Sequence, residues 1–246
     1  MLSEKEYYLT VKGYIADKFN CIGISVNKGH LALGLVDVVG AYDTSSDVLN
    51  DAEVVVVEVK TTTNSFGKSL GQALGYSIFG ERCYLAVTFH GDNTFTKEQE
   101  YIANHLGVGL IRIPVDLNGR PLRAKFEIVL SSKKHEPVQG QKYNMLAAIG
   151  ITKCCICGMF GSQKEMHHLS NDAHRPTLFA PHHKRTFSFC DKCYHDVIPE
   201  EKRRKKANML LAGQKAIITR KRKAAGQKAA QTRKQNTKKK LNENIS

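Results

Sequence analysis

The stretch AEVVVVEVK, residues 52–60, constrains the fold more than any other part of the 246-residue chain. An apolar run of β-branched residues of this length is typical of a strand in the middle of a sheet. Side chains of a strand alternate between its two faces, so Glu58 and Lys60 share one face. Because a buried charge without a partner is costly, these two residues need either a counter-charge or a chemical role.

The patterns on either side of this run predict a mixed α/β domain over residues 1–131. We expect the order helix, three strands, helix, strand, helix, strand. The second and third strands pair as a hairpin because a polar turn separates them. The expected elements are 3–19, 21–26, 31–42, 52–60, 66–80, 82–89, 96–107 and 108–114.

Each strand of the expected hairpin carries one acid within an apolar run, Asp37 in GLVDVVG and Glu58 in VVVVEVK. The hairpin can bring the two carboxylates together, and Mg²⁺ binds through one or two carboxylates while it keeps several waters. Such an ion would neutralise a phosphate and polarise a water, which Lys60 would orient or deprotonate. The sequence therefore predicts phosphodiester hydrolysis, with a charge pair on an edge strand as the structural alternative.

An acid on one strand, Glu-x-Lys on the next and an αβββαβ order together resemble the PD-(D/E)XK nucleases, which include restriction endonucleases and Holliday-junction resolvases. The resemblance covers roughly the first 110 residues. It implies a restriction-endonuclease-like fold in which Asp37, Glu58 and the Val59 carbonyl bind Mg²⁺ or Mn²⁺. It also implies that Lys60 serves the attacking water and that a homodimer cuts both strands of DNA.

The same resemblance implies further site residues. Many relatives add a glutamate from the first helix, for which Glu6 is the first choice and Glu4 the second. Several carry a Gln and a Tyr one turn apart after the Glu-x-Lys strand, and Gln72 and Tyr76 match that pattern. These two would face the active site or the DNA backbone. The proline that often precedes the family's aspartate is absent before Asp37.

Four of the seven cysteines form the Cys-x-x-Cys pairs Cys154/Cys157 and Cys190/Cys193. This spacing is typical of a metal site in a reducing compartment and favours it over disulfides. Four thiolates around Zn²⁺ would make a closed structural site that holds residues 151–199 together. Cys155 is left outside this site, and residues 132–150 are expected to form a linker and a short helix.

The segment between the two pairs holds five histidines and permits a second interpretation. EMHH followed by CDKCYH resembles the zinc-stapled HNH endonucleases. That resemblance implies His168 as general base and His167 as metal ligand, with His195 or Asn171 completing the site. The chain departs from the HNH pattern because the stretch before CDKC lacks an asparagine and Pro199 ends the following helix early. A structural zinc module that binds DNA is the other interpretation.

The formal charge of +14 belongs almost entirely to the tail. Residues 200–246 hold 16 Lys/Arg and 3 Glu, a balance of +13 that leaves +1 for the rest. Such a run binds polyanions by releasing counterions, so DNA is the expected partner and an anionic membrane surface the lesser one. The tail repeats AGQKAIITRK (212–221) as AGQKAAQTRK (225–234), and these units are expected to be helical on nucleic acid or disordered.

The N-terminus, MLSEKEYYL, has acids where a signal peptide would have basic and apolar segments, and no long apolar stretch follows. We therefore expect an intracellular protein, cytoplasmic or nucleoid-associated. Three functions are compatible with the sequence. They are a metal-dependent DNA endonuclease acting through the hairpin, an HNH-type nuclease, and a non-catalytic nucleic-acid-binding protein.

Overall fold

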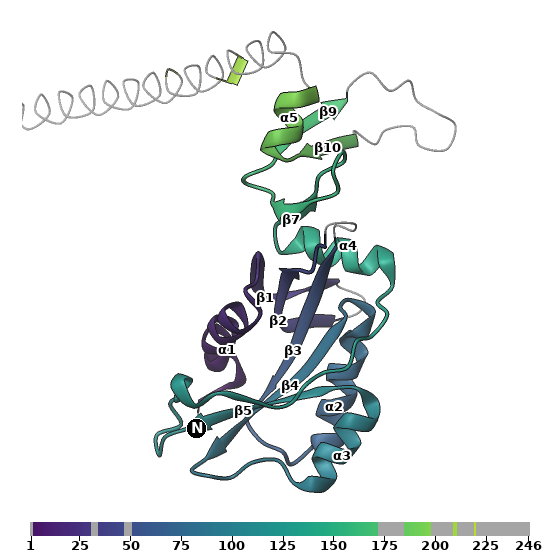
Figure 1. Ribbon diagram of the computed structural model, residues 1–246. Coiled ribbons are helices and arrows are strands. Elements are labelled where there is room, and N and C mark those ends of the chain that lie inside the picture. The colour runs from purple at the N-terminus through teal and green to yellow at the C-terminus, as the bar shows by residue number, and fades with distance from the viewer. Residues whose placement is uncertain are drawn as a thin grey trace, which may run out of the picture. The chain divides into compact units, whose positions relative to one another are not determined.

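The computed structural model describes residues 2–30, 34–46, 51–171, 185–197, 209–210 and 219 (Figure 1). The chain divides into two units, Met1–Cys193 and Tyr194–Ser246, and each is described by itself. The repeat predicted at 212–234, Pro199 and nearly all of the basic tail lie outside the described residues. Within the described ranges, no helix combines the length and the apolar character needed to cross a membrane.

The first unit contains a mixed six-stranded sheet with the strand order β1-β2-β3-β4-β5-β6. Neighbouring strands are antiparallel except for the parallel pairs β3/β4 and β4/β5. The predicted order of elements is confirmed up to β5, whereas β6 was not expected. The elements are α1 (Glu4–Phe19), β1 (Gly23–His30), β2 (Gly34–Asp43), β3 (Ala52–Lys60), α2 (Phe66–Gly75), the 3₁₀ turn η1 (Tyr76–Ile78), β4 (Arg82–His90), α3 (Lys97–Leu106), β5 (Gly109–Val115), the 3₁₀ turn η2 (Arg123–Lys125) and β6 (Glu127–Leu130).

The valine run is the centre of this sheet. Every residue of β3 before Lys60 is buried. Val55, Val57 and Val59 belong to a core that includes residues of α1, while Val54 and Val56 belong to a core on the other face. This alternation is what a strand covered on both faces requires. Figure 1 shows α1 on one side of the sheet and α2 and α3 on the other.

A short helix and two small hairpins follow the sheet. They are α4 (Gln139–Ala148), the hairpin of β7 (Ile151–Lys153) with β8 (Phe160–Ser162), the hairpin of β9 (His167–Asn171) with β10 (Arg185–Phe189), and α5 (Asp191–Val197). The predicted short helix before the cysteine region is present, and it begins earlier than the linker pattern suggested. Met145, Leu146 and Ile151 share a buried core with the valines of β2 and β3.

Candidate functional site

Asp37 lies where strands β2 and β3 separate. The ladder between them starts at Val38 and Val57, so Asp37 is just outside it. One oxygen of its carboxylate accepts the backbone N–H of Val59 at 2.9 Å, and the other accepts the hydroxyl of Tyr8 at 2.6 Å. The Asp37 side chain thus replaces a missing ladder bond and ties α1 to the end of the hairpin.

Glu58 and Lys60 form a buried ion pair at the same end of β3. Lys60 Nζ lies 2.7 Å from Glu58 Oε1, and the Glu58 side chain is only 3% exposed. The other Glu58 oxygen accepts the hydroxyl of Tyr76 at 2.7 Å. Glu58 and Lys60 therefore provide each other's counter-charge.

Glu4, and not Glu6, brings α1 to this cluster. Lys60 Nζ lies 3.2 Å from Glu4 Oε2. Glu6 instead accepts the backbone N–H and the hydroxyl of Ser3 in a capping box at the start of α1. The first choice from the sequence is therefore not brought to the other predicted residues, and the second choice is. We call Glu4, Asp37, Glu58 and Lys60 the acidic site.

The α2 helix presents an open face beside the acidic site. Gln72 is exposed and lines one pocket with Gly34, Gly75 and Tyr76, so the two residues predicted to share a face do so. A side chain added at Gly67, Gly71 or Gly75 would meet no atom within 4 Å. This face of the helix is therefore open, and it borders the pocket that Tyr76 lines.

Burial affects the pKa values of Asp37 and Lys60 in the acidic site. It raises the pKa of Asp37 to about 6, against the opposing effect of the hydrogen bonds from Tyr8 and Val59. The same value includes the nearby charges, of which Glu58 raises the pKa and Lys60 lowers it. Burial alone would lower the pKa of Lys60, but the ion pairs with Glu58 and Glu4 raise it overall. Lys60 is thus held as a cation.

The acidic site holds more acidic than basic groups. Three carboxylates and one ammonium give a formal balance of −2 when all are ionised, at a place where Asp37 and Glu58 are buried. Carboxylate oxygens are the ligands that Mg²⁺ prefers, and a charge of +2 would balance the excess. The partners that Asp37 has, a phenol and a backbone amide, are neutral and leave its charge unbalanced.

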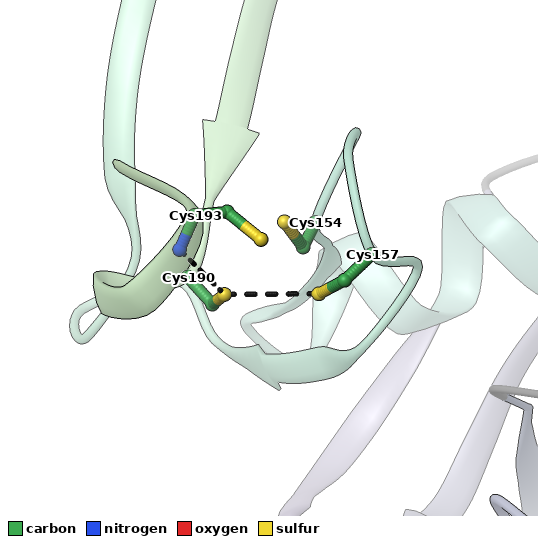
Figure 2. A group of neighbouring side chains, drawn as sticks. All are labelled: Cys154, Cys157, Cys190 and Cys193. Carbon is green, nitrogen blue, oxygen red and sulfur yellow. Dashed lines mark hydrogen bonds between the residues drawn. The ribbon is translucent and has the colours of Figure 1, made fainter. Parts of the chain in front are cut away.

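Four cysteines form a second cluster, which includes a buried Cys154 and Cys190 (Figure 2). The sulfur atoms of Cys154, Cys157, Cys190 and Cys193 all lie within 4.8 Å of one another and point toward one another. Those of Cys157 and Cys190 are 3.7 Å apart, close to the ~3.8 Å edge of a tetrahedron with Zn–S bonds of ~2.3 Å. Cys155 is outside this cysteine cluster, as predicted.

Within the cysteine cluster the pKa of Cys154 is lowered, whereas burial raises the pKa of Cys157 and of Cys193. Burial raises the pKa of Cys154, but the backbone N–H groups of Cys190, Cys157 and Ile156 lower it to about 6. A thiolate supported by backbone donors is the form that binds a metal. The cluster is therefore compatible with a structural zinc centre formed by all four predicted ligands.

The histidines of the HNH-like interpretation are bound within the protein. His168 Nε2 lies 2.7 Å from the carbonyl oxygen of Gln163, so it carries the proton, and Nδ1 lies 3.0 Å from the Ser188 hydroxyl. His167 Nε2 lies 3.0 Å from Asp191 Oδ1. Asn171 ends β9, and His195 belongs to the second unit.

Sequence reasoning missed Tyr8, the buried donor to Asp37. The signal was present, because Tyr8 is four residues after Glu4 and three before Val11, all on one face of α1. Another missed group is at the opposite end of β3, where Glu53 contacts Tyr42, Arg82 and Lys134. Burial opposes ionisation of Glu53, but these three partners lower its pKa to about 2.

No protein-family model matches the chain, and no curated protein matches it. Among solved structures, a protein of unknown function from Silicibacter pomeroyi is 14% identical, with a TM-score of 0.39. The match covers 60% of this chain and 84% of that one. At this level the likeness assigns neither a fold family nor a function.

Proposed function

We propose that the chain is a metal-dependent DNA endonuclease with a PD-(D/E)XK-like fold, and that the acidic site hydrolyses the phosphodiester bond. The observation that carries this proposal is the convergence of Asp37, Glu58 and Lys60 at one end of the β2–β3 hairpin. Glu4, Tyr8, Tyr76 and the backbone N–H of Val59 surround these three residues. The site has an excess of negative charge, and the open face of α2 lies beside it. A purely structural ion pair needs neither feature.

In this proposal, Asp37, Glu58 and the Val59 carbonyl hold Mg²⁺ or Mn²⁺. When bound, the ion neutralises the phosphate and lowers the pKa of a water. Tyr8 and the Val59 N–H fix the orientation of the Asp37 carboxylate, and Tyr76 does the same for Glu58. These neutral donors orient the two acids without cancelling the charge that attracts the cation.

Lys60 has an electrostatic role in this proposal. Its ion pairs with Glu58 and Glu4 raise its pKa, which makes it a poor general base at neutral pH. As a cation it orients the attacking water and stabilises the negative charge that develops on the phosphate. The raised pKa favours orienting over deprotonating, the two possibilities left open by the sequence.

We further propose that the zinc-binding cysteine region and the basic tail bind DNA. The tail carries +13 of the +14 formal charge, which is the sequence-independent attraction that a nuclease needs for its substrate. The open face of α2, with exposed Gln72 and the three glycines, lies next to Tyr76 and gives a strand access to the acidic site.

The test uses supercoiled plasmid with Mg²⁺ or Mn²⁺ and the isosteric variant Glu58→Gln. We expect nicking or linearisation by the wild type and a loss of at least 100-fold in the variant. Glu53→Gln is the matched control, because Glu53 is a buried glutamate at the other end of the same strand. Its cleavage rate should stay within a few-fold of wild type at a temperature where both proteins are folded. Equal activity in Glu58→Gln and wild type would refute the proposal.

A parallel His168→Ala variant tests the HNH-type alternative. Because both ring nitrogens of His168 face partners within the protein, we expect this variant to keep its cleavage activity. Loss of cleavage in His168→Ala together with full activity in Glu58→Gln would transfer the chemistry to the histidine segment. Salt-sensitive DNA binding without cleavage by any protein would support the non-catalytic alternative.

A further inference from the structure

We propose that Ile151 and Phe160 are positioning residues for the acidic site, and that the metal held by the cysteine cluster controls whether that site is ordered. This inference rests on the proposed zinc centre and deepens the proposed function. In this inference the zinc region does more than bind DNA, because it also regulates the acidic site through the protein core. The contacts that support it form three steps: from the cysteines to the β7–β8 hairpin, from the hairpin to the core of the sheet, and from that core to Asp37.

The first step joins the cysteines to the β7–β8 hairpin. Cys154 directly follows β7, and its N–H donates to the carbonyl of Met159, which directly precedes β8. Each strand has only three residues, too few to form a stable hairpin alone. A metal bound by all four sulfurs would link Cys154 and Cys157, which follow β7, to Cys190 and Cys193 in a distant part of the sequence, and its binding energy would stabilise the hairpin. The hairpin therefore depends on the metal.

The second step joins the hairpin to the sheet. Ile151 from β7 and Phe160 from β8 are 2% and 6% exposed, and both belong to the buried cluster that contains Val36 and Val39 of β2. Ile151 lies so close to Gly23 of β1 that a side chain there would come within 2.6 Å of its Cδ1. The two residues thus complete the core beneath β1 and β2.

The third step leads from this core to the acidic site. Val36 directly precedes Asp37 and Val39 follows it by two residues, and both bury their side chains in the same core although they are three residues apart. A regular strand would place them on opposite faces, so β2 departs from strict alternation around Asp37. Tyr76, which donates to Glu58, packs against the same cluster. If Ile151 and Phe160 withdraw, both acids lose packing that holds them in place.

Hydrogen–deuterium exchange of the full chain tests this coupling without any cleavage assay. Zinc-loaded protein is compared with protein stripped by a zinc-selective chelator, and with Cys157→Ser, both in the absence of Mg²⁺. We expect at least tenfold faster exchange over residues 34–43 after zinc loss. Strand β5 is the internal reference, because Leu110 lies in a different core and its exchange should change little.

Two substitutions separate positioning from zinc binding. Phe160→Ala keeps all four cysteines, so it should retain one zinc per chain by atomic absorption and still show the faster exchange over 34–43. Phe160→Leu restores apolar volume and should return that exchange toward wild type. Unchanged exchange over 34–43 in zinc-free protein, while residues 151–162 exchange freely, would overturn the inference. Such a result would leave the Glu58→Gln cleavage test untouched, and a failed cleavage test would leave the exchange result standing.

Discussion

At the scale of single residues, the β2–β3 hairpin illustrates two ways to bury a carboxylate, with Asp37 on β2 and Glu53 on β3. Glu53 receives Arg82, Lys134 and a tyrosine hydroxyl, so its charge is matched inside the protein. Asp37 receives a tyrosine hydroxyl and a backbone N–H, and burial leaves its pKa raised to about 6. We propose that Asp37, which neutral donors orient and only the nearby Lys60 partly compensates, binds a cation, whereas Glu53 stabilises the fold.

Glu53 should make the fold sensitive to acid. Its pKa falls from 4.5 to about 2 on folding, so its stabilisation is complete above pH 4.5 and is lost as the pH falls toward 2. Glu53→Gln should reduce the free energy of unfolding at pH 7 by about 2–3 kcal/mol, because Arg82 and Lys134 lose a buried partner. The variant should also lose stability less steeply below pH 4.5. Urea unfolding between pH 2 and 7 measures both effects. The exposed Asp92→Asn is the control, and equal pH profiles for wild type and Glu53→Gln would contradict the assignment.

Tyr8 should support metal binding through Asp37. Tyr8→Phe removes the 2.6 Å hydrogen bond to Asp37, and we expect Mg²⁺ affinity to fall about tenfold. The Mg²⁺-induced rise in the thermal midpoint measures this affinity. Tyr7→Phe is the matched control, because the Tyr7 hydroxyl is also buried and donates instead to the Gly119 carbonyl at 2.7 Å. A similar loss of Mg²⁺ response in both variants would show that Tyr8 acts only through the stability of α1.

At the scale of elements, the sequence was most informative where one pattern determined one structure. The valine run of β3 and the polar turn before it identified the hairpin. The helix expected over 96–107 is α3, at whose start the Thr96 hydroxyl accepts the N–H of Gln99. The contribution of α1 was harder to predict, because Glu4 and Glu6 both lie in its first turn. Their positions differ by about 200° around the helix, and only Glu4 shares the face of the buried Tyr8. Strand β6 was missed because four half-exposed residues carry little periodicity.

The glycines of α2 give an element-scale prediction. Gly71 is exposed in mid-helix with free space around it, so Gly71→Ala should raise the free energy of unfolding by about 0.5–1 kcal/mol. The same substitution at Gly107 should lower it by about 1 kcal/mol or more, because that residue ends α3 with φ +76° and a side chain there would lie 3.2 Å from His135. Chemical denaturation of the two variants measures this opposite response. A destabilised Gly71→Ala would mean that the helix face is less open than described.

At the scale of the whole molecule, the positive charge and the candidate sites lie in different parts of the sequence. The first 199 residues hold the sheet, the acidic site and the cysteine cluster at a balance of about +1, while the remainder holds +13. Under the proposed function, the acidic site gains little attraction for DNA from its own surroundings, since its carboxylates repel phosphate until a cation binds. We propose that the tail supplies an attraction that is independent of the metal. Binding and cleavage should therefore be separable.

Deletion of residues 200–246 tests this separation. We expect DNA affinity measured in 50 mM salt to fall by more than tenfold, and the dependence of affinity on salt concentration to become much shallower, because fewer counterions are released. Deletion of 225–246 alone removes 6 Lys/Arg and 1 Glu and should give an intermediate slope. The metal requirement for cleavage should be the same in all three proteins, since Asp37 and Glu58 are unchanged. Fluorescence anisotropy between 50 and 300 mM salt measures the slopes. An unchanged slope in the full deletion would show that another surface binds the DNA backbone, and an altered metal requirement would show that the tail takes part in the chemistry.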